Sequence, residues 1–183
     1  QNVIDDIIAI ISDKEAGVYR YNLMKPAFPG KIFPEIAFVK YFAPLDWFIG
    51  AGIYLEELEE TLQQEVLAGI GNIRFGKDGE VFCFRTDGTI LSNQNKRLVG
   101  RSVRGLVDAE GAGYGEVMLQ TVLGAQQQGY VHYSVLRDDT NKTRQKLGFV
   151  QLYPDWGWGL GTSMFMDAME QSIAAETKPY QGI

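Results

Sequence analysis

The pattern of apolar and polar residues divides the chain into helices and strands. Apolar residues recur with helical spacing over residues 2–14 and 56–74, and again from Tyr114 to Gln127. The C-terminal part, which begins near Asp167, has the pattern of an amphipathic helix. Between the helices, runs rich in aromatic and β-branched residues predict strands. These strands are expected over residues 16–24, 34–42, 47–54, 80–86, 89–92, 129–137, 145–153 and 157–165.

The strand pattern occurs twice at one spacing. Trp47 lies 111 residues before Trp158 (158 − 47), and the same offset pairs Gly50 with Gly161. A fixed internal spacing indicates a structural unit that is present twice. Each copy is expected to contain three strands and a following helix that starts with an acidic residue. Further pairs at this offset are Phe38 with Phe149, Val39 with Val150, Tyr54 with Phe165 and Glu56 with Asp167.

The second copy is preceded by predicted elements that the first copy lacks. A hairpin is expected over residues 80–91, where the sequence TDGT contains Asp87-Gly88, a signal for a two-residue hairpin connection. A polar loop then leads to the helix that starts at Tyr114. The first copy starts at its helix, so we expect it to be a partial unit that lacks its leading strands.

Composition and charge exclude several classes of protein. The formal net charge is −6, with 17 Lys and Arg against 23 Asp and Glu, whereas proteins that bind nucleic acid or anionic membranes need clustered positive charge. The single cysteine, Cys83, rules out a disulfide within the chain. No apolar run approaches the roughly 20 residues that span a bilayer. These properties are typical of a folded globular domain.

The glycines of the sequence DWFIGAGIYLEELE raise the question of a phosphate-binding loop. A dinucleotide-binding fingerprint needs three spaced glycines between a strand and a helix. Here Gly50 and Gly52 are followed by strand-like residues and then by Glu56 and Glu57, whose carboxylates would repel a phosphate at the helix start. We therefore favour a strand that leads directly into an acid-capped helix. The second copy, GWGLGTSMFMDAME, has the same order.

These two copies resemble the closing part of Cache domains, a family of PAS-like extracellular sensor modules. The sequence KLGFVQLYPDWGWGLGTSMFMD resembles the C-terminal Cache signature, and AFVKYFAPLDWFIGAGIYLEE resembles it a second time. GEVFCFRTDGTILSNQNKRLVGRSV is similar to the opening Cache hairpin and the loop after it. The resemblance implies an α+β fold, with PAS-like antiparallel sheets flanked by helices in two Cache-like units.

The resemblance also implies how the chain is divided and where it works. Residues 1–57 are expected to form the partial unit, and residues 58–183 the complete sensor unit together with the connecting helix at 56–74. Such tandem domains belong to bacterial transmembrane receptors: chemoreceptors, sensor histidine kinases and cyclic-dinucleotide enzymes. The chain would then be an extracytoplasmic, periplasmic domain that binds a small molecule, able to form a homodimer, with no enzymatic activity or cofactor of its own. Flanking membrane helices would carry the signal inward.

The resemblance to Cache domains implies that the ligand lies between the central sheet and the loop and helix that follow the first hairpin. His132, the only histidine, is either a donor to the ligand or a strand residue with a structural hydrogen bond. The Arg-x-Trp-Tyr and Asp constellation of amino-acid-sensing Cache domains is missing, so an α-amino acid is not favoured as the ligand. With His132, the candidate ligand-binding residues are Arg101, Tyr114, Met118, Tyr133, Lys146, Gln151 and Trp158.

Cationic residues gather in the second unit, although the chain is acidic. Most of them are expected on a solvated loop face, but Arg85 and Lys146 each sit within or at the edge of an apolar strand, where an unpaired charge is costly. A cation there predicts a small anionic ligand, such as a short carboxylate. Glu35 takes the position of Lys146 in the first unit, which is expected to prefer a different charge. The cations are Arg85, Arg97, Arg101, Arg104, Arg137, Arg144 and Lys146.

Two other interpretations stay open. The domain could be a ligandless dimerisation or interaction module, with the helix at 56–74 as its interface. It could also be a cytosolic PAS-like domain that holds a cofactor. An enzyme is the least favoured class, because the sequence contains no evident nucleophile–base pair or cluster of metal-binding residues.

Overall fold

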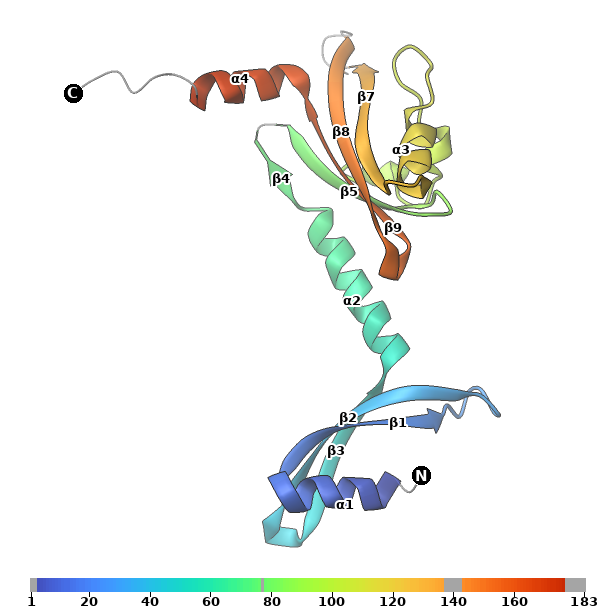
Figure 1. The fold of residues 1–183 in the computed structure, drawn as a ribbon, viewed down its shortest axis with the longest axis vertical. Helices are drawn as coiled ribbons and strands as arrows, with labels where there is room; N and C mark the ends of the chain where they lie inside the picture. Colours follow the sequence, from blue (N-terminus) through green and yellow to red (C-terminus); the bar gives the residue numbers. More distant parts are fainter. Residues whose placement is uncertain (1–2, 77, 137–142, 177–183) are drawn as a thin grey trace, which may run out of the picture. The chain divides into compact units, whose positions relative to one another are not determined.

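The computed structural model describes residues 3–76, 78–136 and 143–176. These residues form antiparallel sheets with helices beside them, which is the α+β architecture that the sequence predicts (Figure 1). The chain divides into two compact units, Gln1–Glu65 and Val66–Ile183. This division and the boundary expected after residue 57 both fall within helix α2, Leu55–Ile70. Residue 2 and Arg137, which belong to two of the predicted segments, lie outside the described residues.

The first unit contains a three-stranded meander with helix α1 packed on it. Strands β1, β2 and β3 pair antiparallel in chain order. Burial alternates along β2, because Ala37 and Val39 are buried while Phe38 between them is exposed. Tyr19, which lies opposite Ala37, donates a hydrogen bond to Asp6 of α1, so α1 covers the face that carries Ala37. The bounds are α1 Val3–Lys14, β1 Ala16–Met24, β2 Ile32–Phe42 and β3 Trp47–Tyr54.

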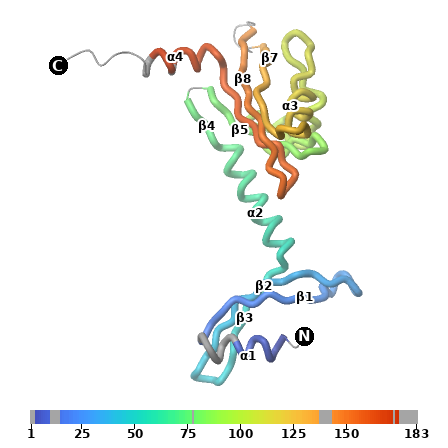
Figure 2. Tube along the Cα trace, viewed as in Figure 1, coloured from blue at the N-terminus to red at the C-terminus, as the bar shows by residue number. Residues whose placement is uncertain are grey.

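The second unit is built on a six-stranded antiparallel sheet. Its order is β4-β5-β9-β8-β7, with β6 paired to β5, so that an early strand lies beside the last one (Figure 2). Helix α3, Tyr114–Leu123, contacts β7 and β8, and helix α4, Met166–Glu176, follows β9. The strands are β4 Arg74–Phe75, β5 Gly79–Arg85, β6 Ile90–Ser92, β7 Gln128–Leu136, β8 Thr143–Tyr153 and β9 Trp158–Phe165.

Strand β5 is buried on both faces of this sheet. Phe82 and Phe84 belong to a cluster that includes Met118 of α3. Cys83, which lies between the two phenylalanines, belongs to a second cluster with Trp158. Successive side chains of a strand point to opposite faces, so a strand that is covered on both sides has a continuous apolar sequence. This is the physical reason for the run VFCF in β5.

The internal repeat of the sequence corresponds to a repeat of strand register. Glu35 pairs with Tyr54 in the first unit, and Lys146 pairs with Phe165 in the second, at the offset of 111 residues that relates the two copies. A short 3₁₀ turn joins these strands in each unit and ends on a residue with a left-handed backbone. The turns are η1 Ala43–Leu45, which ends on Asp46 at φ 53°, and η4 Pro154–Trp156, which ends on Gly157 at φ 61°.

Helix α2 ends earlier than the sequence predicted. The periodicity indicated a helix as far as residue 74, but α2 ends at Ile70. Gly71 and Asn72 follow, and the Asn72 amide donates a hydrogen bond to the carbonyl of Ala68 at 3.0 Å, which caps the helix end. Arg74–Phe75 instead form strand β4, which pairs with the start of β5. Apolar spacing alone did not distinguish the last helical turn from this short strand.

The predicted helix after the polar loop is also shorter than expected. It was expected to reach Gln127, but α3 ends at Leu123, and Gly124 after it has an extended backbone. Gln127, with φ 56°, turns the chain into β7. None of the helices in the described ranges combines the length and the apolar character needed to cross a bilayer.

The predicted hairpin is present, but its connection has three residues, not two. The N–H of Arg85 donates to the carbonyl of Thr89 at 2.8 Å, which leaves Thr86, Asp87 and Gly88 as the connection. Gly88 has φ 97°, a conformation that glycine adopts without the strain of a side chain. Three-residue connections of this kind also place glycine in the left-handed region.

Candidate functional site

A cavity of about 380 Å³ lies in the second unit. It is lined by strands β5, β7 and β8, by the residues that follow the first hairpin, and by helix α3. Small-molecule sites have this make-up, with mostly apolar walls and a few polar groups. The apolar lining includes Phe82, Phe84, Ile90, Leu98, Val103, Leu106, Met118 and Val135. The polar lining is formed by Glu80, Asn93, Gln94, Asn95, Tyr114, Tyr133 and Lys146.

A close approach between α3 and the 3₁₀ turn η3, Val103–Gly105, positions one wall of the cavity. A Cβ atom on Gly115 would lie 1.8 Å from the carbonyl oxygen of Val103. Because this atom belongs to the backbone, it cannot move aside as a side chain would. Glycine at position 115 therefore allows the first turn of α3 to pack on η3, which places Tyr114 at the cavity.

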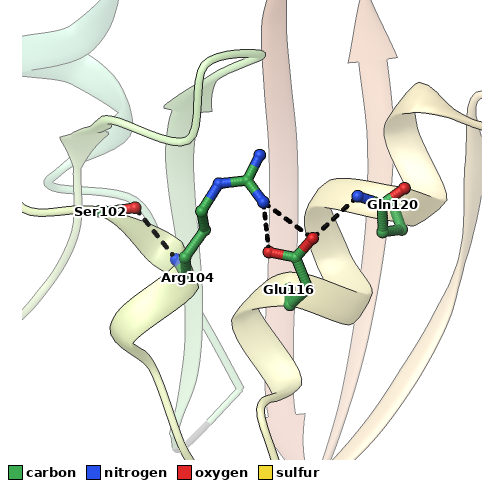
Figure 3. A network of polar contacts seen from close by, with 4 residues as sticks. All are labelled: Ser102, Arg104, Glu116 and Gln120. Carbon is green, nitrogen blue, oxygen red and sulfur yellow. Dashed lines mark hydrogen bonds and ion pairs between the residues drawn. The ribbon is translucent and has the colours of Figure 1, made fainter.

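Arg104 ties the same two elements together at the surface (Figure 3). Its guanidinium binds both carboxylate oxygens of Glu116 on α3, at 2.6 and 2.8 Å, and Gln120 donates to Glu116 at 2.8 Å. The amide of Gln120 and then the charge of Arg104 lower the pKa of Glu116. Ser102 accepts a hydrogen bond from the N–H of Arg104 at 3.2 Å. The network is exposed, and neither Arg104 nor Glu116 lines the cavity.

Two stacked tyrosines face the cavity. The rings of Tyr114 on α3 and Tyr133 on β7 have centroids 4.2 Å apart and planes at 5°. Stacked aromatic pairs add stability beyond the burial of their area. Burial raises the pKa of both hydroxyl groups above their ordinary value. Both side chains are therefore neutral at physiological pH, and their hydroxyls can donate hydrogen bonds.

Lys146 and Glu80 form a charged pair in the cavity wall. The Lys146 ammonium contacts the Glu80 carboxylate, and both side chains are largely buried, at 12% and 13% exposure. The hydroxyl of Ser163 donates to Glu80 at 2.9 Å and lies 3.5 Å from the Lys146 ammonium. The strand order explains this arrangement, because β9 with Ser163 lies between β5 and β8. A buried pair of this kind needs both partners, since either charge alone would be costly to bury.

The corresponding position in the first unit has the opposite charge. Glu35 is buried, and it accepts a hydrogen bond from the hydroxyl of Tyr21 at 2.8 Å. Burial, followed by the hydrogen bond to Glu35, raises the pKa of Tyr21 to about 12. Within the described residues, the second carboxylate oxygen of Glu35 has no hydrogen-bond partner. Whether this unit binds a ligand of different charge remains a prediction.

Helix α4 is attached to the sheet next to the charged pair. Arg144 on β8 binds both oxygens of Asp167 in the first turn of α4, at 2.5 and 3.0 Å. The hydrogen bond from Arg144 lowers the pKa of Asp167 below its ordinary value. The guanidinium carbon of Arg144 lies 3.7 Å from the centre of the Phe165 ring, and Lys146 lies 5.0 Å from it. One aromatic ring thus contacts both the cavity lysine and the anchor of α4.

The structure brings together four of the residues that the sequence suggested as ligand-binding candidates. Tyr114, Met118, Tyr133 and Lys146 all line the cavity. They come from α3, β7 and β8, which are far apart in sequence, and the pairing of β7 with β8 places Tyr133 directly opposite Lys146. Their contact with a ligand remains a prediction.

The other four candidates do not line this cavity. His132 and Gln151 are exposed, because each is one residue from a buried neighbour and so points to the opposite face of its strand. Arg101 is exposed on the loop. Trp158 is buried at 2% exposure in the cluster with Cys83, on the other side of β5 from Phe82 and Phe84.

Sequence reasoning missed Glu80 and the asparagines that follow β6. Glu80 is the first residue of the strand expected over residues 80–86, where an acidic residue resembles an ordinary solvated strand end. Only the register of β5 on β9, which pairs Glu80 with Ser163, brings it to Lys146. No local signal contains that information. In the described part of the chain, no three His, Cys, Asp or Glu side chains are grouped in a way that could hold a metal ion.

Comparison with known proteins identifies the family. The family model dCache_2, described as a Cache domain, matches residues 1–170. The chain therefore belongs to the Cache domain family, as its sequence motifs suggested. A curated relative, the sensor histidine kinase MctS of Rhizobium johnstonii, is 29% identical over 120 residues, which cover 64% of this chain and 25% of that protein. The chain thus spans about a quarter of the length of that relative.

Solved structures show the same fold. A Cache chemosensory domain described as recognising a carboxylic acid is 24% identical, with a TM-score of 0.53, over 59% of this chain and 74% of that one. A methyl-accepting chemotaxis protein from Vibrio parahaemolyticus is 22% identical, with a TM-score of 0.51, over 62% of this chain and 79% of that one. Cache domains of this kind are sensor modules of chemoreceptors and histidine kinases.

Proposed function

We propose that this chain is the extracytoplasmic sensor part of a bacterial transmembrane receptor, and that its second unit binds a short carboxylate. The observation that carries the proposal is the cavity of the second unit, in which the Lys146 ammonium lies among largely apolar walls beside Tyr114 and Tyr133. Apolar walls with a few convergent polar groups are the usual form of a small-molecule site.

The size of the cavity favours a small metabolite. Its volume of about 380 Å³ is near the lower end of the range for small-molecule sites, roughly 300–1,000 Å³. A molecule of a few carbon atoms fits within such a volume. The apolar residues of the wall would contact the alkyl part of that molecule, and the polar side chains would orient its charged end.

The chemistry of the polar groups favours a carboxylate. An ammonium group has three N–H donors, and hydrogen bonds between charged partners are stronger than neutral ones. The two neutral tyrosine hydroxyls are further donors, and all of these groups suit an anion with several acceptors. The carboxylic acid bound by the Cache chemosensory domain of similar fold supports the same ligand class.

The contacts around Phe165 suggest how a bound ligand would reach helix α4. Lys146 and Arg144 both lie against the Phe165 ring, and Arg144 holds Asp167 at the start of α4. A ligand that draws Lys146 away from Glu80 changes the contacts of this ring and, through it, the anchor of the helix. The ligand shifts the helix only as far as it prefers one arrangement over the other.

The relatives support the receptor part of the proposal. They are a sensor histidine kinase and a methyl-accepting chemotaxis protein. In such a receptor, α4 would lead toward a membrane helix and an output domain outside this sequence. We propose the periplasmic location and the receptor output by analogy with these relatives, since the chain matches only a quarter of the kinase.

A thermal-shift screen tests the ligand class. The purified chain is heated with acetate, propionate, pyruvate, L-lactate or succinate, with sodium chloride at matched ionic strength as the reference. A ligand that binds only the folded state, present at a hundred times its Kd, stabilises it by about 2.7 kcal/mol. For a protein of this size, that corresponds to a rise in Tm of roughly 5–10 °C.

Variants connect the shift to the cavity. The double variant Lys146→Met with Glu80→Gln removes the cation without leaving Glu80 as an unpaired charge, so it should fold and lose the response. Arg101→Met removes an exposed cation outside the cavity and should keep the response. The proposal is wrong if no acid raises the Tm of the wild-type chain, or if the double variant responds as the wild type does.

One observation favours a second candidate function, which is dimerisation through α2. Leu62 and Val66 lie one turn apart on this helix and are exposed at 44% and 41%. Exposed apolar residues on a helix are a common feature of helix–helix interfaces. Light scattering over a range of concentrations, on the wild type and on Leu62→Glu, decides whether the helix carries a dimer contact.

A further inference from the structure

Glu80 is a second charged group in the cavity, and its position bears on which carboxylates fit there. The Glu80 carboxylate pairs with Lys146 and accepts a hydrogen bond from Ser163 at 2.9 Å. An ionised carboxylate contains only acceptors, so it depends on its neighbours for donors. Glu80 is 13% exposed and Ser163 is 1% exposed, so bulk water has little access to this part of the wall.

A ligand carboxylate that binds Lys146 competes with Glu80 for the same ammonium. When Lys146 turns to the ligand, Glu80 loses its cationic partner in a largely buried position, which is costly. When Lys146 pairs with Glu80 and with the ligand at the same time, two carboxylates lie around one ammonium and repel each other. In both cases the complex is more stable if the ligand brings a donor of its own for Glu80.

We propose that the cavity selects 2-hydroxy acids over unsubstituted and 2-keto acids of the same length. The ligand carboxylate binds Lys146, and the neighbouring hydroxyl donates to Glu80, which replaces the contact that Glu80 loses. This inference rests on the carboxylate site proposed above. It adds Glu80 as the residue that determines specificity within that site.

The contact between the two charged groups determines where the ligand hydroxyl must be. Because Lys146 and Glu80 touch each other, the carboxyl group and the donor must lie close together in the ligand, as they do on neighbouring carbon atoms. A site that hydrogen-bonds a ligand group discriminates strongly against the analogue that lacks the group.

Isothermal titration of the wild-type chain with three acids of three carbon atoms tests this selection. L-Lactate has the hydroxyl, whereas propionate and pyruvate have no donor at that carbon. L-Lactate is expected to bind about tenfold or more tightly than the other two acids. In the complexes with propionate and pyruvate, the buried Glu80 carboxylate is left without a donor from the ligand, and one unpaired buried acceptor costs about this much. The comparison uses only the wild type, so it does not depend on the folding of any variant.

The variant Glu80→Gln tests whether Glu80 is the cause. Glutamine has the same size but no charge, and its amide adds a donor. Propionate and pyruvate should bind about tenfold more tightly to this variant than to the wild type, and the advantage of L-lactate should fall to within about threefold. Glu110→Gln, at an exposed glutamate outside the cavity, is the matched control and should keep the wild-type order.

The outcomes separate this inference from the proposed function. The selection by Glu80 is overturned if the wild type binds the three acids with equal affinity, or if Glu80→Gln keeps the wild-type order. Either result would still be consistent with the carboxylate site. If none of the acids binds the wild type, the carboxylate site fails, and the selection fails with it. A lactate preference that disappears in Glu80→Gln supports both.

Discussion

Lys146 lies opposite Phe165 in the ladder between β8 and β9, and its ammonium nitrogen is 5.0 Å from the centre of the Phe165 ring. The same ring is 3.7 Å from the guanidinium carbon of Arg144, which binds Asp167 at the start of α4. Cations are attracted to aromatic faces at such distances. The ring therefore connects a residue of the cavity wall with the residue that holds the exit helix.

This relationship predicts the effect of Phe165→Leu. Leucine keeps an apolar residue at the position but removes the cation–π contacts, so binding of a carboxylate at Lys146 should change by no more than about threefold. The change that the ligand causes in hydrogen exchange of α4 should be lost in the variant, because the ring no longer links the two cations. Mass spectrometry of peptides from residues 166–176 measures this exchange.

The control for this experiment is Tyr130→Leu. Tyr130 is an aromatic residue of β7 that is 70% exposed, and its ring contacts Phe149 rather than either cation. This variant should respond to the ligand as the wild type does. If α4 of Phe165→Leu still responds to the ligand as strongly as α4 of the wild type, the ring does not carry the signal.

A second prediction concerns the pH dependence of the α4 anchor. The hydrogen bond from Arg144 holds the pKa of Asp167 below its ordinary value of 3.8. A carboxyl group with a lowered folded-state pKa adds stability above its unfolded pKa, and this stability is lost as the pH falls through the folded value. Hydrogen exchange of α4 should therefore increase as the pH falls below about 4, after correction for the intrinsic rate.

Asp167→Asn tests the assignment of this transition. The asparagine has no charge to lose, so the acid-induced loosening of α4 should be absent, and exchange at pH 6 should already be faster than in the wild type. An acid transition of α4 that persists unchanged in Asp167→Asn would show that another group causes it.

A third prediction concerns the packing of α3. Gly115→Ala places a Cβ atom 1.8 Å from the backbone oxygen of Val103, so α3 must move away from η3. Overpacking of this kind lowers the free energy of unfolding by about 1–3 kcal/mol. The shift also moves Tyr114, so carboxylate binding should weaken. Urea denaturation and titration measure the two effects.

Gly113→Ala is the matched control for this prediction. Gly113 is two residues away, has a negative φ of −77°, and has no atom within 4 Å of the added Cβ. The variant should change the free energy of unfolding by less than about 0.5 kcal/mol. Equal effects of the two substitutions would contradict the close contact between Gly115 and η3.

A fourth prediction concerns the reactivity of Cys83. Burial raises the pKa of its thiol to about 12. At pH 8, the thiolate fraction is then on the order of one in ten thousand, and the thiolate is the reactive form. A thiol reagent should therefore leave the native chain unmodified for hours and modify it within minutes in urea. Rapid modification of the native chain would contradict the buried position of Cys83.

The sequence predicted the repeated parts of the fold well, for a physical reason. The two copies have the same turn, with Asp46 and Gly157 in left-handed backbone conformations, and the same strand register. Local turn geometry determines register, and register determines which side chains share a face. A pattern that is local in sequence therefore specified Lys146 and Phe165 as neighbours across β8 and β9.

The candidate site was only partly predictable, because strand order is not a local property. Glu80 comes next to Lys146 only because β9 pairs with both β5 and β8. Trp158 was expected at the ligand, but its strand presents it to the opposite face, in the cluster with Cys83. Both faces of the sheet are apolar, so alternation along one strand could not show which face contains the cavity.

The most direct test of the carboxylate site is a crystal structure of the chain with the acid that raises its Tm most. We predict electron density for the acid in the cavity, with its carboxylate within hydrogen-bond distance, about 3 Å, of the Lys146 ammonium and its alkyl part against Met118. The Lys146–Glu80 contact should be lengthened or shared with the ligand. An acid bound elsewhere, or an empty cavity with the Lys146–Glu80 pair intact at saturating acid, would contradict the account.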